Sequence, residues 1–206
     1  MKLFTELQKI GKALLTPVAV LPAAGLLLAL GNKLGIPLME QTGGIIFSNL
    51  PLLFCVGVAV GLTNDGIAGL ASIVAFLVMN TVMGITAGVT PEMIGKNPAY
   101  ASIMGIATLQ TGVFGGLVAG VIAAIMFKKF YNIELPAYLG FFAGKRFVPI
   151  ITAAVAFIIG LCMPFLWKPV QAWVAALSYY ANESNTNIST FLFGLVERAL
   201  VPFGLH

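Results

Sequence analysis

Five long runs of the sequence contain no charged residue and consist mainly of apolar residues. In chain order they are Ala13–Gly31, Ile45–Leu62, Gly66–Gly88, Leu109–Phe127 and Phe147–Trp167. A helix needs about 20 such residues to cross the ~30 Å hydrocarbon core of a bilayer, so each run can span a membrane. A sixth run, Ile188–Leu205, differs because it contains two charged residues. The pattern predicts an all-α, polytopic integral membrane protein with about five to six transmembrane helices.

The composition argues against the main alternatives. Of the 206 residues, 59% are hydrophobic and 9% are charged, and the mean hydropathy is +1.00. A soluble domain usually carries about 25% charged residues, so this chain has too few to cover a surface in contact with water. It is also too apolar to remain solvated as a disordered coil. The composition therefore excludes both a soluble enzyme and a disordered protein.

Amphipathic interfacial helices are expected beside the spans. Residues Leu3–Leu15 place apolar side chains at helical spacing opposite charged ones, which is typical of a helix on the membrane surface. Pro17 and Pro22 are expected to kink the first span. Between the fifth and sixth runs, Pro169–Tyr180 contains Trp173 and two tyrosines, so it is expected to form an interfacial helix.

Lysine and arginine are divided unequally between the two sides of the predicted bundle. One side would carry Lys2, Lys9, Lys12, Lys128, Lys129, Lys145 and Arg146, and the other Lys33, Lys96 and Lys168. Because basic residues favour the cytoplasmic side, the N-terminus is expected in the cytoplasm. Topology thus accounts for the net charge of +4, and no nucleic-acid partner is expected.

Glycines recur at four-residue spacing in two of the spans. Gly112, Gly116 and Gly120 form two consecutive steps, and Gly57 with Gly61 forms another. Such steps let helix backbones approach closely in lipid. The partner helix could lie in the same chain or in a second subunit, and packing within the chain is the simpler interpretation.

The sixth run carries the strongest candidate for a substrate site. Ionisable groups at membrane depth cost at least about 2.5 kcal/mol, so Glu197 and Arg198 indicate a substrate or ion path. Pro202 and Gly204 would interrupt the helix just before His206. Arginine donors suit sugar hydroxyls or anions and histidine can accept a proton, so Arg198 and His206 are the preferred candidates and Glu197 a weaker one. In the alternative interpretation, the charged pair only snorkels or pairs locally near the end of the span.

A basic turn, Lys145–Arg146, lies between glycine and proline residues on the predicted cytoplasmic side. Topological anchoring would explain these charges, and the competing hypothesis is a gating or docking loop for an acidic cytosolic partner. Asn64–Gly66 is expected to be no more than a tight polar turn. Cys55 and Cys162 lie inside apolar runs and are expected to be core residues.

Catalytic motifs of soluble enzymes are missing from the sequence. It contains no Ser-His-Asp set, no Cys or His ligand cluster and no phosphate-binding loop. No metal and no cofactor are therefore expected, and any chemistry must use the membrane site.

Four stretches together resemble one family. They are Leu7–Pro22, Asn49–Thr63, Glu134–Ile150 with its Gly-Lys-Arg-Phe-Val-Pro motif, and Glu197–His206 with its Glu-Arg-Ala-Leu-Val-Pro-Phe-Gly-Leu-His motif. The chain resembles the membrane-embedded IIC component of the phosphoenolpyruvate-dependent sugar phosphotransferase system, in the glucose, N-acetylglucosamine and glucoside branch. The start of the last motif and Phe203 are most similar to glucose-type members.

The resemblance implies a multi-pass transporter of the bacterial cytoplasmic membrane that imports a hexose. The sugar would be presented to a cytosolic IIB domain, which is supplied by IIA and phosphorylates the 6-hydroxyl. Arg198 and His206 match positions that contact the sugar, whereas Glu197 and Lys145–Arg146 match motif positions without an assigned role. The phosphoryl group would come from IIB rather than from a cofactor. The resemblance also implies a homodimer formed through the N-terminal helices.

The resemblance divides the chain at residue 180. Residues 1–180 would be the N-terminal transmembrane and dimerisation part of the IIC domain, and residues 181–206 the start of the substrate-binding part. Family members usually continue beyond this point, so the chain is expected to be an incomplete half that neither transports nor phosphorylates alone. The alternatives are a permease or channel without phosphoryl coupling, and an inactive membrane module that only dimerises.

Overall fold

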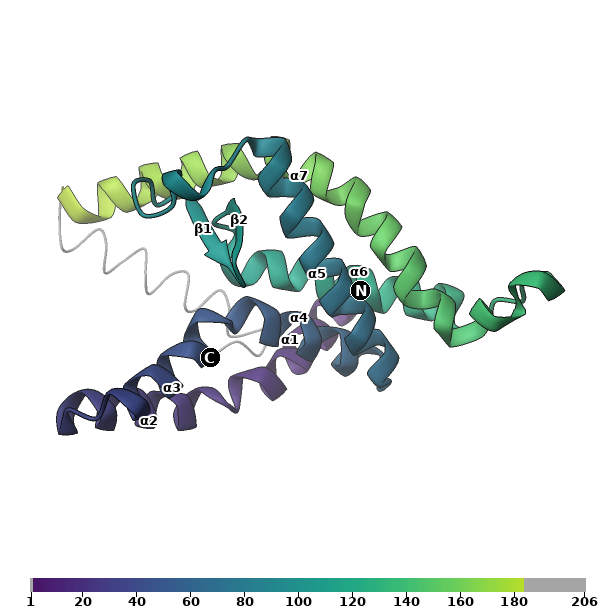
Figure 1. Cartoon of the computed structure of the whole chain (residues 1–206), viewed down its shortest axis with the longest axis horizontal. Helices are drawn as coiled ribbons and strands as arrows, with labels where there is room; N and C mark the ends of the chain where they lie inside the picture. Colours follow the sequence, from purple (N-terminus) through teal and green to yellow (C-terminus); the bar gives the residue numbers. More distant parts are fainter. Residues whose placement is uncertain (1, 184–206) are drawn as a thin grey trace.

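The computed structural model describes residues 2–183, and Glu197, Arg198 and His206 lie outside this part of the chain. The first five helices are α1 (Lys2–Val18), α2 (Leu21–Leu34), α3 (Pro37–Ser48), α4 (Leu50–Thr63) and α5 (Gly66–Ala87). They are followed by η1 (Pro91–Met93), β1 (Tyr100–Ile103), β2 (Ile106–Leu109), α6 (Gly112–Phe130), η2 (Ala137–Phe142), η3 (Gly144–Arg146) and α7 (Phe147–Glu183). The fold is helical, with one short β-hairpin (Figure 1).

Residues 2–183 contain four helical segments long and apolar enough to cross a membrane, and a fifth if a bent pair counts as one span. The four are Gly11–Leu34, Gly66–Ala87, Gly112–Phe130 and Gly144–Trp173, and the bent pair is Pro37–Ser48 with Leu50–Thr63. These segments coincide with the five charge-free runs. The predicted polytopic membrane fold built from helices is confirmed, with the β-hairpin as an addition, whereas the sixth run lies outside the described residues.

The first span is interrupted between its two prolines, as expected. Helix α1 ends at Val18 and α2 begins at Leu21, next to Pro22. Proline lacks a backbone N–H and disturbs the preceding turn, which explains the interruption here. The C-terminal half of α1 belongs to this span, so the predicted surface helix and the first span share one continuous helix.

The second span is also broken, and the sequence did not indicate this break. Helices α3 and α4 meet at Asn49 with a bend of 54°. The Asn49 side-chain amide donates to Ile45 O (2.8 Å), and the Asn49 carbonyl accepts from the backbone N–H groups of Leu52 and Leu53. Asn49 therefore provides hydrogen-bond partners for both helix ends at the break.

The glycine steps pack helices of the same chain against one another. A Cβ atom at Gly116 of α6 would overlap the carbonyl oxygen of Pro51 in α4. Gly61 of α4 lies against Ala13 of α1 in the same way. Packing within the chain, the simpler of the two interpretations, is thus confirmed for these glycines.

A β-hairpin that the sequence analysis missed covers one end of α5. Strands β1 and β2 are antiparallel, with Ile103 opposite Ile106. The two residues between them, Met104 and Gly105, have φ values of 52° and 82°. Positive φ at both central positions is the requirement of a two-residue type I′ turn, and Gly105 meets it without strain.

Helix α7 is longer than the sequence indicated. The apolar run and the predicted interfacial segment Pro169–Tyr180 form one helix of 37 residues that contains Pro164 and Pro169. The prediction of an interfacial helix separate from the fifth span was therefore wrong. Figure 1 shows that α7 changes direction along its length, as proline residues inside a helix explain.

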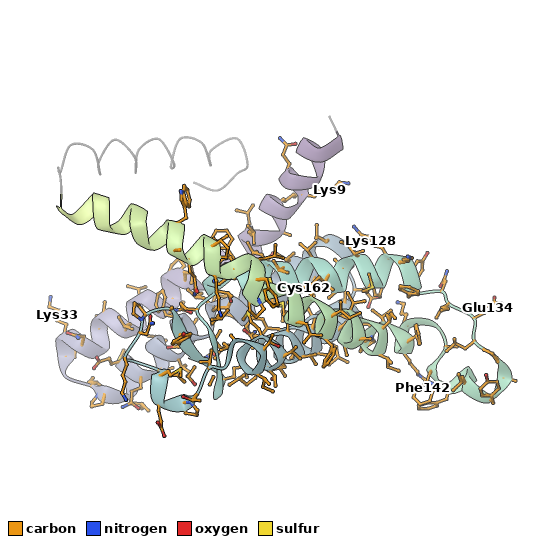
Figure 2. The ribbon with its side chains drawn as sticks, turned by 90° about the horizontal axis from the view of Figure 1, so that it is seen from above. Lys9, Lys33, Lys128, Glu134, Phe142 and Cys162 are labelled. Atoms are coloured by element: carbon orange, nitrogen blue, oxygen red, sulfur yellow. The ribbon has the colours of Figure 1, made fainter. Side chains whose placement is uncertain are left out.

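Lys33 and Glu134 lie at opposite ends of the molecule. Figure 2 shows Lys33 at one end and Glu134 at the other, with Lys128 and Lys9 between them. The helices between them are apolar, and α5 packs against α4, α6 and α7 at their centre. The arrangement agrees with spans that alternate in direction across a bilayer.

Candidate functional site

The predicted cytoplasmic motif Lys145–Arg146 forms η3, immediately before α7. Gly144 precedes it with φ 66°, a conformation that glycine adopts readily. The Gly144 N–H donates to Ile133 O (2.9 Å), which closes the loop between α6 and α7 at its base. The two basic side chains therefore start from a defined backbone position at the end of the helical bundle.

Lys145 is directed toward the end of the bundle. Its ammonium group forms an ion pair with the Asp65 carboxylate, with Nζ 2.5 Å from Oδ2. The same ammonium lies 5.9 Å from the centre of the Phe127 ring of α6. Lys145 thus connects the loop before α7 to the α4–α5 turn and to the last part of α6.

Asp65 is a functional candidate that the sequence reasoning dismissed as part of a turn. It is the N-cap of α5, and its Oδ1 accepts a hydrogen bond from Ile67 N (2.9 Å). The hydrogen bond from Lys145 lowers the pKa of Asp65 below its usual value, and the Ile67 N–H lowers it further. An Asp followed by an apolar helical run is an N-cap signature, which was the available signal in the sequence.

Arg146 points the other way, into the exposed loop. Its guanidinium donates from Nη1 to Phe141 O (3.2 Å) and lies 4.9 Å from the centre of the Phe141 ring. Among residues 2–183 no carboxylate forms an ion pair with Arg146, and its side chain is exposed. The ring of Phe141 is 70% exposed and Tyr138 is 83% exposed beside it.

The two basic residues of the motif therefore differ in what they can do. The charge of Lys145 is paired with that of Asp65, so Lys145 holds the loop against the α4–α5 turn. Within residues 2–183 the cation of Arg146 has no carboxylate partner and lies on the exposed ring of Phe141, a combination suited to an acidic partner. Figure 2 shows Phe142 and Glu134 in the same projecting loop.

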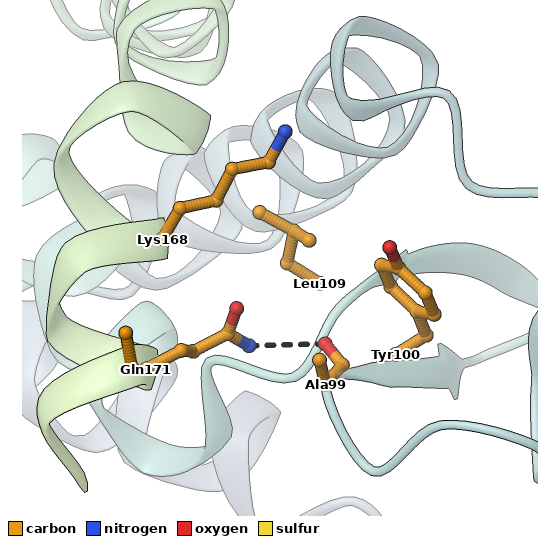
Figure 3. Close-up of a pocket in the computed structure, with 6 residues that line it drawn as sticks. Ala99, Tyr100, Leu109, Lys168 and Gln171 are labelled. Atoms are coloured by element: carbon orange, nitrogen blue, oxygen red, sulfur yellow. Dashed lines mark hydrogen bonds between the residues drawn. The ribbon is translucent and has the colours of Figure 1, made fainter. Parts of the chain in front are cut away.

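A small pocket lies at the opposite end of the molecule, between α7 and the β-hairpin (Figure 3). Its volume is about 290 Å³, and its lining residues are Ala99, Tyr100, Leu109, Lys168, Gln171 and Ala172. Gln171 extends along one side of the pocket and donates a hydrogen bond from Nε2 to Ala99 O (3.0 Å). The residues predicted to bind sugar lie outside the described part of the chain, so the structure does not bring them to this pocket or to Lys145.

Comparison with known proteins gives a consistent result. A family model described as "Phosphotransferase system, EIIC" matches residues 11–206. The chain is 48% identical over 238 aligned positions to the PTS system glucoside-specific EIICBA component of Staphylococcus carnosus, covering 100% of this chain and 34% of that protein. It is 50% identical over 226 positions to the PTS system glucose-specific EIICBA component of Staphylococcus saprophyticus, with coverages of 100% and 33%.

The chain spans about a third of the length of these curated relatives. Both relatives match along the whole chain, and the family model covers all of it except the first ten residues. The match includes the described helices, the Lys145–Arg146 motif and the segment with Arg198 and His206. This chain belongs to the phosphotransferase system EIIC family.

Proposed function

We propose that the chain is part of a transporter that imports glucose or a related hexose and presents its 6-hydroxyl to a phosphorylated IIB domain. The observation that carries the proposal is the match of residues 11–206 to the EIIC family, together with the match of the chain to relatives whose names specify glucose and glucoside. The helical membrane fold supports it, because a group-translocating transporter must place its substrate site within a bundle of spans.

The sugar would be bound by residues of the last segment. Arg198 supplies hydrogen-bond donors to sugar hydroxyls, and His206 lies near the hydroxyl that is phosphorylated. Adjacent residues of a helix project about 100° apart, so on a helix Glu197 would support the site from a different face than Arg198. The phosphoryl group comes from IIB, and no cofactor takes part.

The cytoplasmic partner would approach the end that carries Lys145 and Arg146. Arg146 is exposed and unpaired within residues 2–183, and it is stacked on Phe141. A cation held rigidly beside aromatic rings is a common energetic centre of protein interfaces. We propose that Arg146 contacts an acidic surface of IIB, while the Lys145–Asp65 pair fixes the loop.

The proposal includes a topology and an assembly. The N-terminus is cytoplasmic, and residues 1–180 form the transmembrane and dimerisation part of a homodimer in the bacterial cytoplasmic membrane. Residues 181–206 begin the substrate-binding part. Exposed apolar side chains on α2 and α3, such as Leu26, Leu38 and Ile45, suit contact with lipid or with a second copy.

The proposal is tested with the transporter that contains this chain, in membrane vesicles supplied with phosphorylated IIB. Phosphorylation of glucose, N-acetylglucosamine and a methyl glucoside is measured. Arg198→Ala or His206→Ala should abolish phosphorylation while the amount of protein in the membrane stays normal. Lys33→Ala, at the opposite end from the motif, is the matched control. Normal coupled uptake in either variant removes that residue from the site.

The competing function is a permease without phosphoryl coupling. It predicts sugar uptake at the same rate with and without phosphoenolpyruvate, and free sugar inside the vesicle. The group-translocation proposal predicts that only sugar phosphate accumulates. Chemical identification of the accumulated sugar separates the two functions.

A further inference from the structure

We propose that Trp167 and Gln171 are positioning residues that brace the C-terminal half of α7 against the β-hairpin, and thereby set where the sugar-binding segment begins. The inference rests on the proposed function, because it concerns how Arg198 and His206 are presented. The brace itself is visible in the described part of the chain.

Three hydrogen bonds form the brace. The Trp167 indole Nε1 donates to Gln110 O (3.0 Å), and the Gln171 amide Nε2 donates to Gln110 O (3.1 Å) and to Ala99 O (3.0 Å). Trp167 and Gln171 are one helical turn apart and lie on the same side of α7. Figure 3 shows Gln171 reaching from α7 to Ala99 at the hairpin.

Both acceptors lie where the hairpin begins and ends. Ala99 precedes β1 and Gln110 follows β2, and the Gln110 N–H donates to Ala99 O (2.8 Å). One side-chain amide of α7 thus contacts both ends of the hairpin at once. A contact of this kind restrains the direction of the helix as well as its distance.

The hairpin is a firm support because it is fixed to α5. A Cβ atom at Gly84 would overlap the carbonyl oxygen of Ala107, so β2 lies directly on the α5 backbone. Ile103 and Leu109 are buried in the same core cluster as Met79 of α5. The acceptors for Trp167 and Gln171 therefore belong to the central, well-packed part of the bundle.

Helix α7 needs such a restraint in this region. Pro164 and Pro169 lack backbone N–H groups, so two hydrogen bonds of the helix are missing around Trp167. Beyond Pro164, Trp167 packs against the core, whereas Phe165 is 77% exposed and Trp173 is 67% exposed. The hydrogen bonds to the hairpin are the specific polar contacts that define the direction of α7 here.

The direction of α7 matters because the segment with the predicted sugar-binding residues follows this helix in the sequence. The part from Pro169 to Glu183 is about 20 Å long at 1.5 Å per residue. A change of about 10° at Pro169 would move Glu183 by about 4 Å. A displacement of about 1 Å already weakens substrate positioning, so a loosely held α7 would weaken substrate binding by the segment that follows it in the sequence.

The brace is tested by distance measurements between two spin labels. Both native cysteines are first replaced by alanine. Leu70 of α5 and Trp173 of α7, which are both exposed, are then replaced by cysteine to carry the labels. The test variant combines Trp167→Phe, which keeps the ring beside Phe114, with Gln171→Glu, which keeps the shape but removes the donors. The control is Gln41→Glu, the same change at an exposed position of α3.

A narrow distance distribution is expected in the unmodified background and in the Gln41→Glu control. The double variant should broaden or shift it, and Gln171→Lys, which again supplies donors of similar reach, should restore it. An unchanged distribution in the double variant would overturn the brace. If the double variant does not reach the membrane, Gln171→Glu alone is measured with the same criteria.

The positioning role has its own measurement in the transporter that contains this chain. Gln171→Glu should raise the KM for glucose several-fold at constant amounts of membrane protein, with a smaller effect on the maximal rate. Gln171→Lys should recover the KM. A broadened distribution with an unchanged KM would overturn the positioning role. If the unmodified transporter phosphorylates no sugar, the proposed function fails, whereas the spin-label result still decides the brace.

Discussion

Lys145 and Asp65, which are 80 residues apart in the sequence, form an ion pair with 2.5 Å between Nζ and Oδ2. Asp65 simultaneously caps the N-terminus of α5, so one carboxylate organises a helix start and holds the loop before α7. The pair joins three elements at the end where the cytoplasmic partner is proposed to bind. Lys145 of the basic motif therefore has a defined partner in the folded protein.

Replacing Asp65 separates its two roles. Asp65→Asn keeps an oxygen that can accept from Ile67 N but removes the negative charge, whereas Asp65→Ala removes both. We expect the Lys145 amine to react several-fold faster with a water-soluble acylating reagent in both variants. Only Asp65→Ala should also lower the unfolding temperature clearly.

The measurement is mass spectrometry of peptides from detergent-solubilised protein, together with thermal unfolding. Lys128 is the internal control, because it is exposed at the same end and its labelling should not change. Equal labelling of Lys145 in the wild type and in Asp65→Asn would contradict a lasting ion pair.

The same pair predicts a specific pH dependence. The pKa of Asp65 is lowered in the folded state by Lys145 and by Ile67 N–H, below the value of about 3.9 in an unfolded chain. Its stabilising contribution is therefore complete above about pH 4 and is lost as the pH falls through the lowered pKa. The difference in unfolding temperature between wild type and Asp65→Asn should stay constant from about pH 5 to pH 8. A difference that disappears near pH 6 would assign the effect to another group.

Gly116 should not tolerate a side chain. An alanine Cβ would overlap Pro51 O of the neighbouring helix, and overpacking of a close contact costs about 1–3 kcal/mol. Gly116→Ala should therefore lower the unfolding temperature in detergent. Gly66→Ala is the control, since a Cβ at Gly66 meets no atom within 4 Å and the position is the first of α5. Equal unfolding temperatures of the two variants would contradict the α4–α6 packing.

The two cysteines should differ in reactivity. Cys55 is fully buried, as expected, and donates to Ser72 O (3.2 Å). Cys162 is exposed on α7, so its prediction as a core residue was wrong. N-ethylmaleimide should modify Cys162 in the folded protein and Cys55 only after denaturation, as intact-mass measurement can show. Modification of Cys55 at the rate of Cys162 would mean that the α4–α5 contact opens readily.

The spans could be predicted from the sequence because charge-free length is a local property. Ala13–Gly31 and Phe147–Trp167 each fall inside a span of the structure, and the interruption between Pro17 and Pro22 has a local cause. Within the hydrocarbon core there is no water to bond the backbone, and a single segment satisfies its own backbone hydrogen bonds only as a helix. A long charge-free run therefore leaves little choice of secondary structure. The resemblance to the EIIC family rested on motifs in four stretches of the chain, and the family match over residues 11–206 confirmed it.

Features that depend on tertiary contacts could not be predicted in this way. The hairpin needs the positive φ at Met104, which methionine rarely adopts, and it depends on the space that Gly84 leaves on α5. In the structure α7 continues through Pro169, and side-chain hydrogen bonds of this helix reach both ends of the hairpin. The sequence could not indicate them, because they join residues 57 to 72 positions apart.

The candidate site was predictable only in part. The motif Lys145–Arg146 was identified from charge, but the opposite directions of its two side chains follow from Asp65 and Phe141. Asp65 was expected only as part of a polar turn, although an Asp before an apolar run is an N-cap signature, and its pairing with Lys145 had no signal in the sequence. Arg198 and His206 remain predictions, since they lie outside the described residues.

The corner at Asn49 has a consequence for how the chain enters the membrane. Its backbone and side chain give partners to groups of Ile45, Leu52 and Leu53, all within four residues. No distant helix is required to satisfy the polar groups at the bend. The corner can therefore form from local hydrogen bonds alone, before α5 and α6 have been synthesised. Helices α5 and α6 would then pack against an α3–α4 pair that is already bent.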